Sequence, residues 1–392
     1  MDKSIYFDHA ATTAVKKEVL QEMLPYFTEK YGNASTVYRI GQVSKAALDD
    51  ARARVARVFN CKPNEIFFTG CGSESDNWAI KGAARANKAK GNHIITTAIE
   101  HHAVLHTCKT LEKEGFEVTY LPVDKYGLVS ADDVKNAIKD NTILISIMYA
   151  NNEIGTIEPI AEIAEIAKEK GILMHTDAVQ AAGAVPIDLS KLKVDMMSLS
   201  AHKFNGPKGV GALYIRSGVR IANIIDGGAQ ERGKRAGTEN LPGIIGLAKA
   251  LELASASMEE KDKKITALRD YIIKNIEEKI PYCRLNGHRT QRLPGNVNFS
   301  FEFIEGESLL LWLDINGIAA SSGSACTSGS LDPSHVLLAI GLKHETAHGS
   351  LRVSLGEENT YEEADYFIEK LVGIVDKLRK MSPLYESMKG EN

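Results

Sequence analysis

Three short stretches each follow an apolar run with residue types that can do chemistry. "SLSAHKFNGPKGVG" places Lys203 after such a run, and "MHTDAVQ" ends another with Asp177 and Gln180. "FTGCGSESDN" follows a third with Gly72 and Ser73 at a predicted helix start. Alone, each is best explained as a strand cap, a turn carboxylate or a helix cap. Together they supply an amine, a carboxylate and a helix N-terminus.

These three groups are the parts that hold pyridoxal phosphate. The backbone N–H groups and the dipole at a helix N-terminus bind a phosphate. A carboxylate such as Asp177 keeps the pyridine nitrogen protonated, so that the ring accepts electrons. A lysine such as Lys203 forms a Schiff base once desolvation or nearby positive charge lowers the pKa of its amine. We therefore predict a pyridoxal-phosphate site where these strand ends meet.

The elements that must position these residues alternate along the chain from about residue 40 to 215. Helical spacing predicts helices over 74–89, 102–114 and 160–170. Short apolar runs predict strands at 65–69, 93–97, 118–121, 142–150, 172–177, 195–200 and 210–215. Continuous apolar strands separated by helices indicate an α/β fold with a mostly parallel sheet, flanked by helices, that binds ligands beyond the carboxyl ends of its strands.

The pattern changes near residue 258, where a charged run precedes an amphipathic helix. "NVNFSFEF" then alternates as a half-solvated antiparallel strand would, and a last helix is predicted from about 361 to 380. One face of that strand would carry Val297, Phe299, Phe301 and Phe303. We expect a large cofactor-binding domain at 16–257 and a smaller α+β domain made of 1–15 and 258–392.

Composition and charge exclude several other classes of protein. The 392 residues are 44% hydrophobic and 25% charged, with a net charge of -4, which does not favour nucleic-acid or anionic-membrane binding. The sequence shows no apolar run of membrane-spanning length. Its five scattered cysteines form no CxxC pair, so we expect neither a disulfide framework nor a thiolate metal cluster, and a cytoplasmic location.

Ordered motifs over almost the whole chain give a more specific signal. They are "YFDHAATT", "YGNAS", "FTGCGSESDN", "EHHAVL", "ANNEIGT", "HTDAVQ", "SAHKFNGPKGVGALY", "GGAQERGKRAGTEN", "EGESLL", "SSGSACTSGSLDPSHV" and "LRVSLG". In these the chain resembles the fold-type I pyridoxal-phosphate enzymes of the class V aminotransferase family, and more closely the class I cysteine desulfurases of the NifS/IscS type. "YGNAS" departs from the family pattern, with Ala34 where proline is common.

The resemblance implies a role for each matching residue. Lys203 would hold the cofactor covalently, Asp177 would pair with its pyridine nitrogen, and Gln180 with its phenolic oxygen. His101 would stack on the ring and move protons. The phosphate would be surrounded by Gly72, Ser73, Ser200, His202 and, from the other subunit of a homodimer, Thr238. The substrate would be held by Asn152, beside cofactor and substrate, and by Arg352 and Asn33, which bind its carboxylate.

The resemblance also separates a desulfurase from a general aminotransferase through Cys326. This residue lies in "SSGSACTSGS", whose small residues and turn formers predict a loop. A thiolate on a loop can attack the sulfur of L-cysteine, leave L-alanine and carry a persulfide to an acceptor. That acceptor would be an iron–sulfur scaffold protein or another sulfur acceptor, with Cys326 a possible transient cluster ligand. The remaining cysteines are interpreted as structural or incidental: Cys61, Cys71, Cys108 and Cys283.

Other functions fit the sequence less well. "HETAH" at 344–348 matches the zinc-hydrolase pattern, and His102 and His106 have the same spacing, but a strand-like segment follows Gly349 and no third ligand is supplied. A non-catalytic sulfur carrier would not need the lysine and carboxylate. A selenocysteine lyase or a related aminotransferase remains the nearest alternative.

Overall fold

The computed structural model describes residues 4–322 and 333–390, with side chains up to residue 386. The strands are β1 Ile5–Tyr6, β2 Ile66–Thr69, β3 His93–Thr97, β4 Glu117–Leu121, β5 Thr142–Ser146, β6 Leu173–Asp177, β7 Met196–Ser200, β8 Gly211–Ile215, β9 Cys283–Leu285, β10 Asn296–Phe301, β11 Ile318–Ala319 and β12 Ser350–Ser354. The helices are α1 Lys17–Met23, α2 Pro25–Thr28, α3 Arg39–Val58, α4 Gly72–Asn87, α5 His102–Lys113, α6 Ala131–Ala137, α7 Ile160–Glu169, α8 Gln230–Gly233, α9 Leu241–Ala256, α10 Met258–Lys279, α11 Gly306–Ile315, α12 His335–Ala339, α13 His344–His348, α14 Tyr361–Lys380 and α15 Pro383–Gly390.

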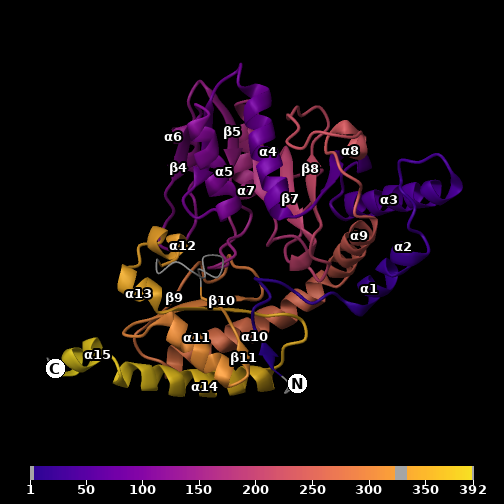
Figure 1. Ribbon diagram of the computed structural model, residues 1–392. Helices are drawn as coiled ribbons and strands as arrows, with labels where there is room; N and C mark the ends of the chain where they lie inside the picture. Colours follow the sequence, from indigo (N-terminus) through magenta and orange to yellow (C-terminus); the bar gives the residue numbers. More distant parts are fainter. Residues whose placement is uncertain (1–3, 323–332, 391–392) are drawn as a thin grey trace.

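A seven-stranded sheet forms the upper layer in Figure 1, in the order β2-β8-β7-β6-β5-β3-β4. Strands β7, β6, β5, β3 and β4 run parallel, and β8 runs antiparallel to both β7 and β2. The predicted α/β fold with a mostly parallel central sheet is therefore confirmed. Every residue of β2, β3, β5, β7 and β8 is buried, as expected for strands covered on both faces.

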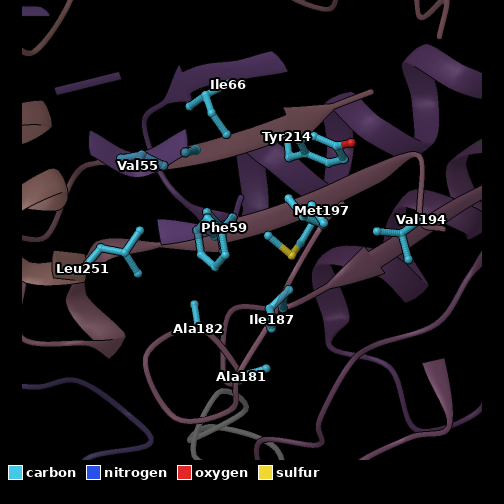
Figure 2. Close-up of a cluster of buried hydrophobic side chains, with 14 of the residues drawn as sticks. Val55, Phe59, Ile66, Ala181, Ala182, Ile187, Val194, Met197, Tyr214 and Leu251 are labelled. Atoms are coloured by element: carbon cyan, nitrogen blue, oxygen red, sulfur yellow. The ribbon is translucent and has the colours of Figure 1, made fainter. Parts of the chain in front are cut away.

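Adjacent residues of one strand supply the two cores of this sheet. Met197 of β7 packs in a cluster with Val55 of α3 and Leu251 of α9, and Figure 2 shows these side chains around the same strand. Met196 packs instead with Trp78 of α4 on the other face. Alternation of side chains across a strand thus attaches helices to both faces of the sheet.

A smaller sheet, β12-β10-β9, is antiparallel and packs with α10, α11 and α14 around a separate core. The prediction that β10 is half-solvated is wrong, because all six of its residues are buried. Its polar face is covered through hydrogen bonds: Asn296 and Asn298 donate to the carbonyl of Glu153 at 3.0 Å. Phe303 lies beyond the strand with a φ of 68°.

The N-terminal segment forms a two-stranded sheet with β11 and then contacts the small sheet. β1 pairs in parallel with β11, and Asp8 forms a bridge to Ser354 at the end of β12. The division into domains at 16–257 and at 1–15 with 258–392 stays a prediction. It is favoured because the core of the small sheet shares no residue with the core that α3 and α9 form against the large sheet. Within the described ranges, no single helix is long and apolar enough to cross a membrane; α9 and α10 pass that test only jointly, across a bend of 71°.

Candidate functional site

Asp177 and Lys203 come from neighbouring strand ends. β6 ends at Asp177, which pairs in register with Ser198 of β7, and β7 ends at Ser200. The chain then turns through a single 3-10 turn, Ala201–Lys203. The strand order therefore brings two of the predicted site residues to one edge of the sheet, where parallel strands present their carboxyl ends.

The Asp177 carboxyl is buried, and its Oδ1 accepts a hydrogen bond from the Val179 amide at 2.9 Å. Burial raises its pKa to about 6, although that hydrogen bond and the charge of Lys203 act in the opposite direction. A protonated ring nitrogen beside this carboxylate would offset the cost of burying it. The environment thus suits a carboxylate that pairs with a cationic ligand atom.

Behind Asp177 lies a buried polar network that was not predicted from the sequence. His175 shares hydrogen bonds with Ser146 at 2.8 Å and Ser198 at 2.9 Å, and its Nε2 lies 3.7 Å from Oδ1 of Asp76. Burial lowers the pKa of His175 to about 3. Burial and the nearby Asp177 raise the pKa of Asp76. The motif "SESDN" contains Asp76, but only the fold shows that α4 points this carboxyl toward β6.

The N-terminus of α4 approaches the same strand ends. A Cβ added at Gly72 would lie 2.7 Å from Val179 Cγ2 and 3.3 Å from Ser200 Cβ, so only glycine permits this approach. The helix cap is Cys71, whose Sγ accepts from the Glu74 amide at 3.4 Å, and not Ser73. Ser73 is the exposed second residue of α4. The first turn of α4 therefore presents its backbone N–H groups beside Ser200.

The N-terminal segment crosses the site next to Lys203. The Lys203 ammonium donates to the carbonyls of Ala10 at 2.5 Å and Ala11 at 2.8 Å. Gln180 donates to the same Ala10 carbonyl at 3.0 Å, and the His202 ring hydrogen-bonds the Thr12 hydroxyl at 3.1 Å. The motif "DHAATT" thus connects Lys203, Gln180 and His202 through its backbone and its threonine.

His101 caps the N-terminus of α5, and its Nδ1 accepts from the Ala103 amide at 3.1 Å. Burial, followed by the positive charge of Lys203, lowers its pKa to about 4. The ring is therefore neutral at pH 7 and carries its proton on Nε2. The influence of Lys203 indicates that the two predicted residues share one electrostatic environment.

Arg352 of β12 reaches the site from the small sheet. Its Nη1 donates to the Asn152 carbonyl at 3.1 Å, and its Nη2 pairs with Oδ1 of Asp8 at 2.8 Å. Its buried Nε has no hydrogen-bond partner among the residues that the structure describes. Asp8 was not identified as a site residue from the sequence, although "YFDHAATT" contains it. Arg352 thus contacts Asn152 and Asp8, and the roles of Arg352 and Asn152 toward a substrate stay predictions.

Two predicted residues are not brought to this cluster, and a third cannot be placed. Asn33 is exposed, and its hydrogen bonds in the described part of the chain stay within residues 33–36. Thr238 is exposed between α8 and α9. Cys326 lies outside the described residues. The roles of all three remain predictions.

The residues at this edge fit pyridoxal phosphate. Gly72 provides a close backbone approach at a helix N-terminus, which suits a phosphate. Asp177 provides a buried carboxylate for a ring nitrogen, and Lys203 provides the amine. The donor set therefore matches an aldehyde-bearing aromatic phosphate in each of its parts.

The "HETAH" stretch folds as the single short helix α13, and the strand-like segment predicted after Gly349 is β12. His344 and His348 lie on α13 with ring centroids 6.1 Å apart. Across residues 4–322 and 333–390, no group of three histidine, cysteine or acidic side chains is arranged to hold a metal ion.

Comparisons with known proteins agree with this geometry. The model of the aminotransferase class-V family matches residues 5–367. The chain is 62% identical to cysteine desulfurase IscS of Clostridium botulinum over 98% of both chains. A solved NifS-like protein matches with a TM-score of 0.90 and 42% identity, over 96% of this chain and 100% of that one. A structure described as SspA in complex with cysteine matches with a TM-score of 0.81 and 38% identity, over 91% and 100%.

Proposed function

Because the chain belongs to the aminotransferase class-V family, we propose that it is a cysteine desulfurase that converts L-cysteine to L-alanine. One observation carries the proposal: a protein named cysteine desulfurase is 62% identical to this chain over 98% of its length. The likeness to a structure described as a complex with cysteine supports the substrate. A selenocysteine lyase or a related aminotransferase would share the same strand-end residues and differ in the reaction at sulfur.

We propose pyridoxal phosphate as the cofactor. The first turn of α4 with Gly72 and Ser200 would hold its phosphate, Asp177 its ring nitrogen and Lys203 its aldehyde carbon. When bound, it supplies a carbonyl that condenses with amines and a ring that withdraws electrons from the substrate Cα. The proposal also includes contacts to the phosphate from Ser73 and His202, and a contact to the phenolic oxygen from Gln180.

Lys203 is proposed as the base that removes the Cα proton, because His101 is poorly suited to accept one. The His101 Nδ1 lone pair is engaged by the Ala103 amide, and protonation of the ring is opposed by burial and by Lys203. His101 instead offers an N–H donor at Nε2. It can therefore orient the cofactor through this donor, while the amine of Lys203 takes the Cα proton and, once protonated, returns it.

Arg352 is proposed to bind the substrate carboxylate. A guanidinium offers planar paired donors for a carboxylate, and the Nε of Arg352 has no partner among the described residues. Asp8 fixes the other edge of the guanidinium through Nη2, and Asn152 fixes Nη1. Asn33 was predicted to bind the same carboxylate. To do so it would have to form hydrogen bonds in addition to those it makes within residues 33–36.

Cys326 is proposed as the nucleophile toward sulfur. Its thiolate attacks the sulfur of the substrate, an S–S bond forms and the C–S bond breaks. The electron pair stays on the carbon skeleton, which takes up a proton and leaves as alanine. The persulfide on Cys326 would then pass to an iron–sulfur scaffold or another sulfur acceptor, with Cys326 a possible transient cluster ligand.

A homodimer and a cytoplasmic location are part of the proposal. Exposed large apolar side chains are concentrated between residues 20 and 43, and an exposed apolar surface of this kind indicates a protein partner. They are Leu20, Leu24, Phe27, Tyr31, Val37, Tyr38, Ile40 and Val43. Thr238 is exposed, as a residue that reaches into a second subunit must be.

The test measures alanine and sulfide formed from L-cysteine, together with the visible absorption of the purified protein. Cys326→Ala should keep the absorption band of the bound cofactor and lose sulfide formation by about 100-fold or more, because no thiolate attacks the substrate. Lys203→Ala should lose the normal band. Sulfide formation by Cys326→Ala at the parent rate would refute the nucleophile, and transamination without sulfide would favour an aminotransferase. Cys61→Ala is the control and should behave as the parent.

A further inference from the structure

A cavity lies between the large and small sheets, next to Lys203, and is called the inter-sheet cavity below. It leaves about 120 Å³ in which the centres of water molecules fit, several times the space that one water needs. Of the predicted site residues in the described part of the chain, only Lys203 and Gln180 line it. Asp177, His101 and Arg352 do not. The cavity therefore adjoins the strand-end site at Lys203 and Gln180 and extends away from its other residues.

One wall of the inter-sheet cavity is apolar. It is formed by Ala250 and Ala254 of α9, Ile265 of α10, and Leu293. These residues come from the two cores on either side of the bend between α9 and α10. Burying aliphatic groups of a ligand against them would remove apolar surface from water.

The polar part of the inter-sheet cavity has a hydrogen-bond acceptor that is not satisfied. Asp262 Oδ1 is buried and has no hydrogen-bond partner among the described residues. The ammonium of Lys261 lies 4.0 Å from it and donates to the Gly183 carbonyl at 2.5 Å. The His9 Nε2 at the same cavity faces the Glu358 carboxylate, 3.5 Å away.

The other ammonium groups at the cavity are already engaged. Lys16 pairs with Glu357 at 2.6 Å, and Lys203 donates to Ala10 and Ala11. Buried acceptors without donors are costly, so an occupant that supplies donors is favoured over one that supplies acceptors. A carboxylate, by contrast, would meet three acidic residues that line the cavity, Asp262, Glu357 and Glu358.

We propose that the inter-sheet cavity binds a small aliphatic compound with an ammonium group, whose N–H donates to Asp262 and whose carbon chain packs against the α9 alanines and Leu293. Such an occupant would contact both sheets and the Ala10 segment that holds Lys203. The proposal does not depend on the reaction, because it concerns binding alone.

The test compares two probes of the same carbon number by calorimetric titration into the purified full chain. N,N-dimethylbutylammonium carries one N–H donor and, as a tertiary amine, cannot condense with an aldehyde. N,N-dimethylbutanamide has a similar shape and only an acceptor. The ammonium probe should bind saturably. The affinity of the amide probe should be lower by about tenfold or more, as expected for loss of a charged hydrogen bond.

Variants assign the binding to Asp262. Asp262→Asn should weaken ammonium binding about tenfold, and Glu260→Gln, an exposed neighbour on α10, should leave it unchanged. Ala254→Val narrows the apolar wall without touching a charge and should also weaken binding. Absence of saturable binding, equal binding of both probes, or parent-like binding by folded Asp262→Asn and Ala254→Val would each overturn the proposal.

Discussion

Asp177, Asp76, Glu100 and His175 lie in one buried region, and burial pushes all of them toward their neutral forms. A site that holds a charged cofactor must balance this tendency with specific partners. Asp177 has one such partner in Lys203. Glu100 has, within residues 4–322 and 333–390, only two hydrogen-bond donors, Thr97 and Met148, both on Oε1. The ionised form of Glu100 is therefore the less compensated of the two.

Glu100 should make the stability of the protein depend on pH. Its pKa is raised from 4.5 to about 8, mainly by burial, so between these values the folded protein holds a proton that the unfolded chain has lost. The contribution of Glu100 to the free energy of unfolding is therefore complete below pH 4.5. As the pH rises from 4.5 to about 8, this contribution falls by about 1.4 kcal/mol per pH unit. Glu100→Gln should remove that dependence, so its thermal midpoint should fall less than that of the parent between pH 6 and pH 8.

The matched control for Glu100 is Glu114. This exposed residue pairs with Arg85, which lowers its pKa and moves its titration out of the pH range measured. Glu114→Gln should therefore follow the parent across the whole range. Parallel curves for Glu100→Gln and the parent would contradict the role given to Glu100.

At the scale of elements, the start of α4 determines how closely backbone N–H groups approach the strand ends. Gly72→Ala should weaken cofactor binding by about tenfold or more, because the added Cβ would lie 2.7 Å from Val179 and displace the first turn. Titration of cofactor-free protein followed by absorption measures the effect. Gly373→Ala on α14 is the control, since its Cβ meets nothing within 4 Å, and it should leave cofactor affinity unchanged. Equal affinity of Gly72→Ala and the parent would exclude this turn from the phosphate site.

Most of the large sheet could be predicted because its strands are short apolar runs with helices between them. β3 and α14 have the predicted bounds, whereas β5 ends at Ser146 and not at residue 150, since the apolar run continues past the sheet. Helix α9 was not predicted because it is apolar on nearly all sides and so lacks a helical stripe.

The site was predictable where its residues follow strands and not where it depends on distant pairing. Lys203 and Asp177 stand at strand ends, so the fold class alone brings them together. The pair between Asp8 and Arg352 joins residues 344 positions apart, and no local pattern signals it. The polar face of β10 was predicted to meet solvent because polar residues alternate with apolar ones along the strand. In the structure this face is buried, and its Asn296 and Asn298 donate to the Glu153 carbonyl.

At the scale of the whole molecule, the apolar surface of residues 20–43 should bury itself against a second copy. Leu24→Glu combined with Phe27→Glu places charges on side chains that are 53% and 57% exposed, and should convert a dimer to monomers in sedimentation velocity. Leu311→Glu, at a 66% exposed position on α11, should sediment as the parent. A dimer that survives the double substitution would place the interface elsewhere.

The N-terminal segment has a consequence for synthesis. Ala10 and Ala11 hold the Lys203 ammonium, and Ala10 is itself held by the Ser354 hydroxyl at 2.8 Å, while β1 pairs with β11. The hydrogen bond from the Ala10 amide to Ser354 can therefore form only after Ser354 has been synthesised, well after Lys203 itself.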